Sequence, residues 1–310
     1  MVNICDGLPA EDDVDPREQD VARRFPLDPG KTVKVGVRRI HALIHPGLSF
    51  LILSDGSRRA QAALDVGGHI AQLAHARVTI LAYGMKAGAV ERHLQEAKEK
   101  LGSGLASLEV RSSVESAEAA VAHEVEHQAH DLIIIGREGQ KPAHWISLAE
   151  SILRLGEHHL LITPGIDSEP AHALVCVTGG EPGKEDVLFA GRFLRHLGAD
   201  ATLLSVIPAT GNNSELYDRV QRFLQGGVRT LDVLKVPAET VIRTGNAREE
   251  INEQMEEGGH DLLILGAPLN RRRGEISLQG LVGQILEDNT AHPVLIVRSR
   301  YAAAGYYPRH

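Results

Sequence analysis

The sequence predicts an α/β protein made of two tandem, doubly wound sandwich domains, each with a five-stranded parallel sheet. Two observations lead to this prediction. Segments of the first half recur in the same order in the second half, and each half alternates short apolar runs with longer amphipathic stretches. Short apolar runs bounded by glycine or proline are typical of strands buried on both faces. Strands that alternate with helices indicate right-handed crossovers and a parallel sheet covered on both sides.

Three pairs of segments carry the repeat. HDLIIIG at 130–136 recurs as HDLLILG at 260–266, HHLLIT at 158–163 is echoed by HPVLIV at 292–297, and ARVTIL at 76–81 matches DATLL at 200–204. Because the pairs keep their order, we expect a tandem duplication. We place the first domain at 48–166 and the second at 171–300.

The apolar runs of the first unit predict strands at 50–53, 78–82, 108–111, 132–135 and 159–162. The helical spacing of apolar residues between these runs predicts helices at 58–75, 89–101, 116–129 and 147–155. In the second unit we expect strands near 173–177, 201–206, 240–243, 261–265 and 293–297. The two last strands, 158–163 and 292–297, are expected to bury against each other, as two single domains would in a homodimer.

The ends of the chain do not follow the repeat. Residues 1–30 mix acids, proline and arginine without periodicity, which is typical of a flexible segment. Residues 31–47 predict an extra ordered element, and 301–310 indicate a loose end or a contact arm.

The composition excludes several classes of protein. A net charge of −8 over 310 residues argues against non-specific nucleic-acid binding, which favours a basic face. The acidic N-terminus has no apolar signal segment, and no apolar run is long enough to span a bilayer. Cys5 and Cys176 stand far apart, which excludes a disulfide framework and a cysteine zinc site. We therefore expect a cytoplasmic protein that binds neither nucleic acid nor membrane.

Candidate ligand contacts follow the strands of the first unit. Asp55 ends the first strand and opens a helix, so that its carboxylate could accept hydrogen bonds from a ribose or an adenine; a helix cap is the alternative. Gly136 and Gly139 follow the fourth strand, where glycine lets backbone N–H groups approach a phosphate, although a plain turn would serve as well. Ser147 is expected to start the next helix and add a hydroxyl donor.

Other residues of this loop are compatible with two interpretations of their role. Lys141, His144 and Trp145 could touch a nucleotide or pack over the edge of the sheet. In the helix before it, His123 and His127 stand at i, i+4 beside His130 and could share a metal, but ordinary surface histidines explain them better.

The second unit has fewer such features. Thr178 stands where Asp55 stood, and Leu269 replaces the second glycine after Gly266. The arginines at 271–273 could bind phosphate or form a solvated turn. By contrast, TGNAREEI at 244–251 is a clear strand-to-helix junction.

These residues resemble the universal stress protein family in its tandem form. The resemblance covers about 250 residues and depends on LSDGS at 53–57, TGNAREEI, the two DLIIIG-like strands and the closing HPVLIV. It implies an adenine nucleotide alpha hydrolase-like fold and, from the family pattern G-x2-G-x9-G-[ST], an ATP site in the first domain formed by Asp55, Gly136, Gly139 and Ser147. The connecting loop is about three residues shorter than that pattern, and Ile146 occupies the place of its third glycine.

In the second domain Gln279 and Gly280 replace the last two residues of the pattern, so the resemblance implies a degenerate site there. No catalytic motif is present, and slow ATP hydrolysis is the most that the sequence supports. Magnesium accompanying ATP is the only metal expected, and a homo-oligomer, a dimer, is the expected assembly. The competing hypothesis is a nucleotide-free scaffold that acts through protein partners.

Overall fold

The computed structural model describes residues 47–298, with gaps at 86, 102–103, 138–141, 165–169, 179–180, 210–213, 271–274 and 290. The expected flexible segment 1–30, the extra element 31–47 apart from Gly47, and the tail 301–310 lie outside the described residues.

All the strands and helices expected in the first half are present. They are β1 (Ser49–Ser54), α3 (Arg58–Leu73), β2 (Arg77–Tyr83), α4 (Ala87–Leu101), β3 (Ser107–Ser113), α5 (Ala117–His127), β4 (Leu132–Gly136), α6 (Pro142–Leu155) and β5 (His159–Thr163). The largest difference is in α6, which begins at Pro142 instead of at 147. Proline is favoured at the first position of a helix, because it has no N–H group to leave unpaired there.

The second half repeats this order and adds one hairpin. Its elements are β6 (His172–Cys176), α7 (Glu181–Leu197), β7 (Asp200–Ile207), α8 (Ser214–Val233), β8 (Ala238–Thr244), α9 (Ala247–Glu257), β9 (Leu262–Gly266), β10 (Leu269–Asn270), β11 (Glu275–Ile276), α10 (Leu281–Asp288) and β12 (Val294–Val297). The antiparallel pair β10–β11 was not expected. Each of its strands has two residues, which is too short for an alternating pattern to be recognised.

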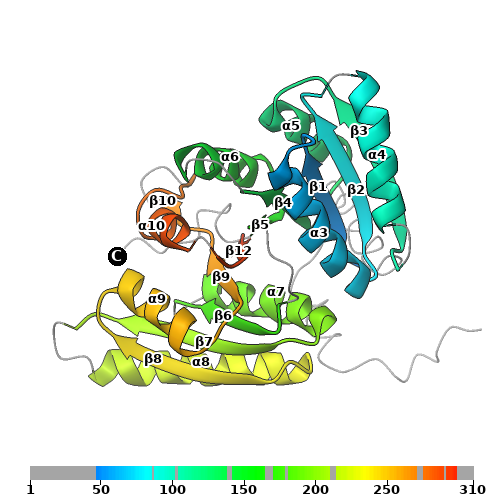
Figure 1. The fold of residues 1–310 in the computed structure, drawn as a ribbon. Helices are drawn as coiled ribbons and strands as arrows, with labels where there is room; N and C mark the ends of the chain where they lie inside the picture. The colour runs from blue at the N-terminus through cyan, green and yellow to red at the C-terminus, as the bar shows by residue number, and fades with distance from the viewer. Residues whose placement is uncertain are drawn as a thin grey trace, which may run out of the picture. The chain divides into compact units, whose positions relative to one another are not determined.

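The described strands other than β10 and β11 form one ten-stranded sheet in the order β3-β2-β1-β4-β5-β12-β9-β6-β7-β8 (Figure 1). Read from its two ends, the sheet gives the same order twice, with the third, second, first, fourth and fifth strand of each half. Neighbouring strands within each half are parallel. The predicted doubly wound α/β fold is therefore confirmed in both halves. The division into domains at 48–166 and 171–300 stays a prediction.

The two halves join through their last strands. β5 and β12 pair antiparallel, with Leu161 opposite Leu295 and Ile162 opposite Val294. All four side chains are fully buried. This pairing confirms the expectation that 158–163 and 292–297 bury against each other.

Two apolar layers cover the two faces of the sheet. Along β1, Phe50 and Ile52 belong to the core formed with α3, α4, α7 and α8, whereas Leu51 and Leu53 belong to the core formed with α5, α6, α9 and α10. Successive side chains of a strand point to opposite faces, so an uninterrupted apolar run such as 50–53 supplies both cores. No helix in the described part of the chain is long and apolar enough to cross a bilayer.

The repeated His-Asp pair ties the amino ends of neighbouring strands together. The Asp131 carboxylate accepts a hydrogen bond from the backbone N–H of Ser49 at 2.8 Å. In the second half, the Asp261 carboxylate accepts bonds from the N–H groups of Ala171 and His172, both at 2.8 Å. The motif recurs because each copy satisfies donors that the start of its first strand would otherwise leave unpaired.

A buried histidine beside the strand β5 makes stability depend on pH. His158 is 3% exposed, and its Nε2 lies 2.8 Å from the carbonyl oxygen of Ile152. Burial lowers the pKa of His158 to about 4, with the charges of Arg298 and His130 adding to the decrease. An unfolded histidine has a pKa of about 6.5, so the unfolded chain takes up this proton first as the pH falls. The stabilisation is complete above about pH 6.5 and is lost as the pH falls towards 4.

We predict that His158→Gln reduces this acid sensitivity, because glutamine can still donate to Ile152 but does not titrate. Between about pH 7 and about pH 4.5, the free energy of unfolding of the unmodified chain should fall by ~2 kcal/mol more than that of the variant. Urea denaturation at the two pH values measures this difference, and other titrating groups cancel in the comparison. An equal fall in both proteins would contradict a buried neutral His158.

Candidate functional site

The candidate site lies at the carboxyl ends of β1 and β4. These strands are parallel neighbours, with Ile52 opposite Ile134. Extending this register by two residues sets Ser54 opposite Gly136, so Asp55 and Gly136 leave the sheet at the same edge. The strand order also reverses here, since the chain continues from β1 to β2 on one side while β4 lies on the other. In open α/β sheets, ligands bind at such a switch point.

Asp55 supports the start of α3. Its Oδ1 accepts hydrogen bonds from the backbone N–H of Ser57 at 3.0 Å and from the Ser57 hydroxyl at 2.5 Å. Ser57 is the N-cap residue of α3, and its Oγ accepts a bond from the N–H of Ala60. The helix cap, which was the alternative role for Asp55, is therefore Ser57. Asp55 is half-buried and orients the Ser57 side chain.

The residue after Gly136 belongs to the contact between the halves. The Arg137 side chain is 6% exposed and donates to the carbonyl oxygens of Leu286 at 3.4 Å and His292 at 3.1 Å. Its guanidinium carbon lies 5.5 Å from the centroid of the Trp145 ring. Burial lowers the pKa of Arg137 to about 10, which leaves it charged at neutral pH. Leu286 is near the carboxyl end of α10, where the helix dipole favours a cation.

The expectation that Ser147 starts the helix is wrong. Because α6 begins at Pro142, Ser147 lies in the second turn, where its side chain is exposed. In the same helix Trp145 is 3% exposed and packs in the core, while His144 is exposed. Gly139 and Lys141 lie outside the described residues. The structure therefore brings together Asp55 and Gly136 of the predicted set and sets Ser147 apart from the start of the helix.

The corresponding edge of the second half has different chemistry. The exposed Thr178 follows β6, and Gly266 ends β9. The predicted junction at 244–251 is present, with Asn246 as the N-cap residue of α9 and its Oδ1 accepting from the N–H of Arg248 at 2.9 Å. The arginines at 271–273 lie outside the described residues.

Side chains of α6 add further contacts between the halves. Glu150 accepts a hydrogen bond from the N–H of Leu278 at 2.8 Å, and Arg154 donates to the carbonyl oxygen of Ile276 at 2.9 Å. The two side chains also form an ion pair at 2.6 Å. Their i, i+4 spacing is visible in the sequence, but nothing in it indicates that their partners lie more than a hundred residues away.

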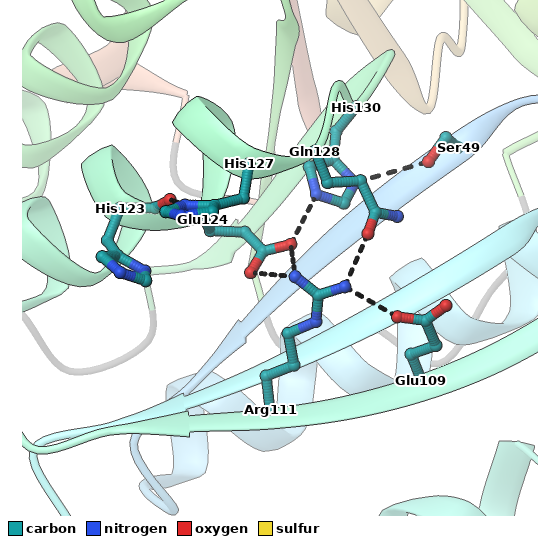
Figure 2. Close-up of polar contacts among 8 residues, drawn as sticks. All are labelled: Ser49, Glu109, Arg111, His123, Glu124, His127, Gln128 and His130. Atoms are coloured by element: carbon teal, nitrogen blue, oxygen red, sulfur yellow. Dashed lines mark hydrogen bonds and ion pairs between the residues drawn. The ribbon is translucent and has the colours of Figure 1, made fainter.

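Figure 2 shows a polar cluster between β3, α5 and the start of β4, which centres on Arg111. The Arg111 guanidinium contacts Glu124 at 2.9 Å and Glu109 at 2.8 Å, and Glu124 also lies 3.0 Å from the Nε2 of His130. Burial lowers the pKa of His130 even though Glu124 opposes this shift.

This cluster has a counterpart in the second half and joins a strand to the helix that follows it. Arg243 of β8 pairs with Glu250 at 2.6 Å, Glu253 at 2.8 Å and Glu257 at 2.9 Å, all on α9. The same tie between strand and helix in both halves indicates a structural role.

The exposed rings of His123 and His127 lie with their centroids 4.4 Å apart and their planes tilted by 31° (Figure 2). Across the described residues, no group of three or more His, Cys, Asp or Glu side chains could hold a metal ion.

Residues 171–298 match the universal stress protein family. No curated protein matches the chain.

Solved structures extend the likeness in fold to both halves. A universal stress protein from Archaeoglobus fulgidus DSM 4304 aligns with a TM-score of 0.62 and 15% identity over 81% of this chain and 96% of its own. A functionally unknown protein from Pseudomonas aeruginosa PAO1 aligns with a TM-score of 0.61 and 17% identity over 85% and 96%. A structure of the universal stress protein from Archaeoglobus fulgidus in complex with dAMP covers 42% of this chain and 99% of its own, at 15% identity and a TM-score of 0.34.

We predict that Arg137 stabilises the contact between the halves. Arg137→Met removes the donors to the carbonyl groups of Leu286 and His292 and should lower the free energy of unfolding by about 1–3 kcal/mol. Arg154→Met serves as the control, because the Arg154 side chain is 44% exposed and its loss should cost less than about 1 kcal/mol. Urea denaturation of the three proteins checks this order, and an equal cost for the two variants would contradict it.

Proposed function

We propose that the chain is a tandem universal stress protein that binds an adenine nucleotide, in the first instance ATP, in its first domain at 48–166. The observation that carries this proposal is the position of Asp55 and Gly136 at one edge of neighbouring strands. The second domain, at 171–300, is proposed to have lost the nucleotide site.

The proposed contacts divide between the two ends of a nucleotide. Asp55 would accept hydrogen bonds from the ribose or the adenine, because a carboxylate is an acceptor with two oxygens. Gly136 and Gly139 would let the backbone approach the phosphates. Ser147 would reach the ligand only as an exposed side chain from the second turn of α6.

The first domain also suits the magnesium ion that accompanies ATP. Magnesium would arrive with ATP, held by the phosphate oxygens and waters, while the Asp55 carboxylate is kept for the ribose or the adenine. In the second half the uncharged Thr178 follows the corresponding strand. This difference is the reason for assigning the nucleotide to the first domain alone.

A nucleotide-free scaffold is the second candidate function, and two contacts favour it. Arg137, next to Gly136, is engaged with the second half, and Asp55 is engaged with Ser57. As a scaffold, the protein would use the residues of this edge to stabilise the fold and would act through protein partners. The outer edges of the sheet, β3 and β8, would serve a homodimer in either case, since an unpaired strand edge can pair with a second chain. We propose a cytoplasmic location for both functions.

We predict that ATP with magnesium binds one site per chain and that Asp55→Ala weakens this binding at least about tenfold, which corresponds to the loss of roughly 1.4 kcal/mol. Thr178→Ala, the matching change in the second half, should leave the affinity unchanged. Isothermal titration calorimetry of the full chain measures both effects.

Absence of heat at millimolar ATP would exclude the nucleotide function and leave the scaffold. Equal affinity in the unmodified chain and Asp55→Ala would move the site away from the β1–β4 edge. Thermal unfolding of Asp55→Ala without ATP checks that the variant is folded, because the substitution also removes the acceptor for Ser57.

A further inference from the structure

The second half contains a buried carboxyl group that has no hydrogen-bond partner on one oxygen. Asp186 lies on α7 and is 5% exposed, and its Oδ1 is without a partner among the described residues. Burial raises the pKa of Asp186 to about 8, and the charge of the neighbouring Glu185 adds to this increase. A buried polar atom without a partner costs free energy, so its presence requires an explanation.

Asp186 faces the switch point of the second half. A Cβ atom added to Gly266, the last residue of β9, would lie 2.4 Å from the Asp186 Oδ2. The helix α7 follows β6, and β6 and β9 are the neighbours between which the strand order reverses. The carboxyl group therefore lies at the edge where α/β sheets bind ligands, and glycine at 266 makes room for it.

The first half shows that the fold does not need an acid at this position. The offset of 123 residues that relates Ser49 to His172, the first residues of β1 and β6, also relates Ala63 to Asp186. Ala63 is fully buried in the core of α3. Because alanine satisfies the same position without an unpaired polar atom, the acid in the second half costs stability without helping the fold.

We propose that the β6–β9 edge of the second half binds a primary ammonium group, which Asp186 holds through its carboxylate. An ammonium group supplies both things that the carboxyl group lacks, a hydrogen-bond donor for Oδ1 and a positive charge. A phosphate group carries negative charge and would not provide the positive charge that the buried carboxyl group lacks, and a hard metal cation requires more oxygen ligands than one carboxylate supplies. The small exposed fraction limits the ligand to the free ammonium ion or to the end of a small amine.

Ammonium and potassium ions give the direct test, because they are similar in size and only ammonium has hydrogens to donate. We expect ammonium chloride to raise the stability of the full chain above that in potassium chloride at equal concentration and about pH 7.5. At ~10 times the Kd, the ratio of folded to unfolded chain should rise about tenfold. Binding should also release protons, because the neutral carboxyl group ionises when it pairs with the cation. Methylammonium chloride distinguishes the end of an amine from the free ion.

Two variants of Asp186 and one control complete the experiment. Asp186→Asn and Asp186→Ala should lose the difference between ammonium and potassium, and the alanine variant should be more stable than the unmodified chain. Glu185→Gln, which removes one charge from the adjacent residue, should keep the difference. If the unmodified chain does not distinguish the ions, or if Asp186→Ala still distinguishes them, the proposal is wrong. Neither result would affect the nucleotide proposal, which concerns the first half.

Discussion

The antiparallel pairing of β5 with β12 is the interaction on which the rest of the structure depends. Each half ends its own parallel sheet with a fully buried apolar strand, and such a strand needs a hydrogen-bonded neighbour on its outer side. The other half supplies this neighbour, so neither last strand remains an edge strand of the sheet. Contacts around the pairing then follow: Arg137, Glu150 and Arg154 of the first half each bond to backbone groups of the second.

The candidate nucleotide edge and the contact between the halves involve adjacent residues of the sequence. Gly136 is the last residue of β4, and the next residue, Arg137, contacts the second half. A ligand at Gly136 would therefore act on a segment that is anchored across the contact. The second half differs from the first at its own switch point, where Thr178 and Asp186 stand in place of Asp55 and Ala63. The two halves thus share one strand order and differ in the side chains at the carboxyl ends of the strands.

Much of the fold could be predicted, because its strands are buried on both faces. Runs such as 132–135 must be apolar throughout, and the aspartate of the repeated His-Asp pair accepts from the corresponding backbone donor in each half. The pairing of the last strands was also predictable, since both runs are apolar and recur in the same place. The meeting of Asp55 and Gly136 at one edge followed from the parallel order of the strands.

The remaining features depend on contacts that no local pattern records. Pro142 rather than Ser147 begins α6, and the short hairpin β10–β11 has too few residues for periodicity to show. The partners of Arg137 lie about 150 residues further along the chain, so its burial could not be seen from its neighbours in sequence. The sequence alone predicts that Asp186 is a solvent-facing helix residue, because it does not show the packing against Gly266.

Amide hydrogen exchange of the full chain tests the central claim most directly, because it reports whether the last strands are paired with each other. We expect the amides of 160–162 and 294–296 to exchange as slowly as those of β1 and β4, through global unfolding. Exchange of these two segments as fast as that of the outer strands β3 and β8 would contradict a single sheet running through both halves.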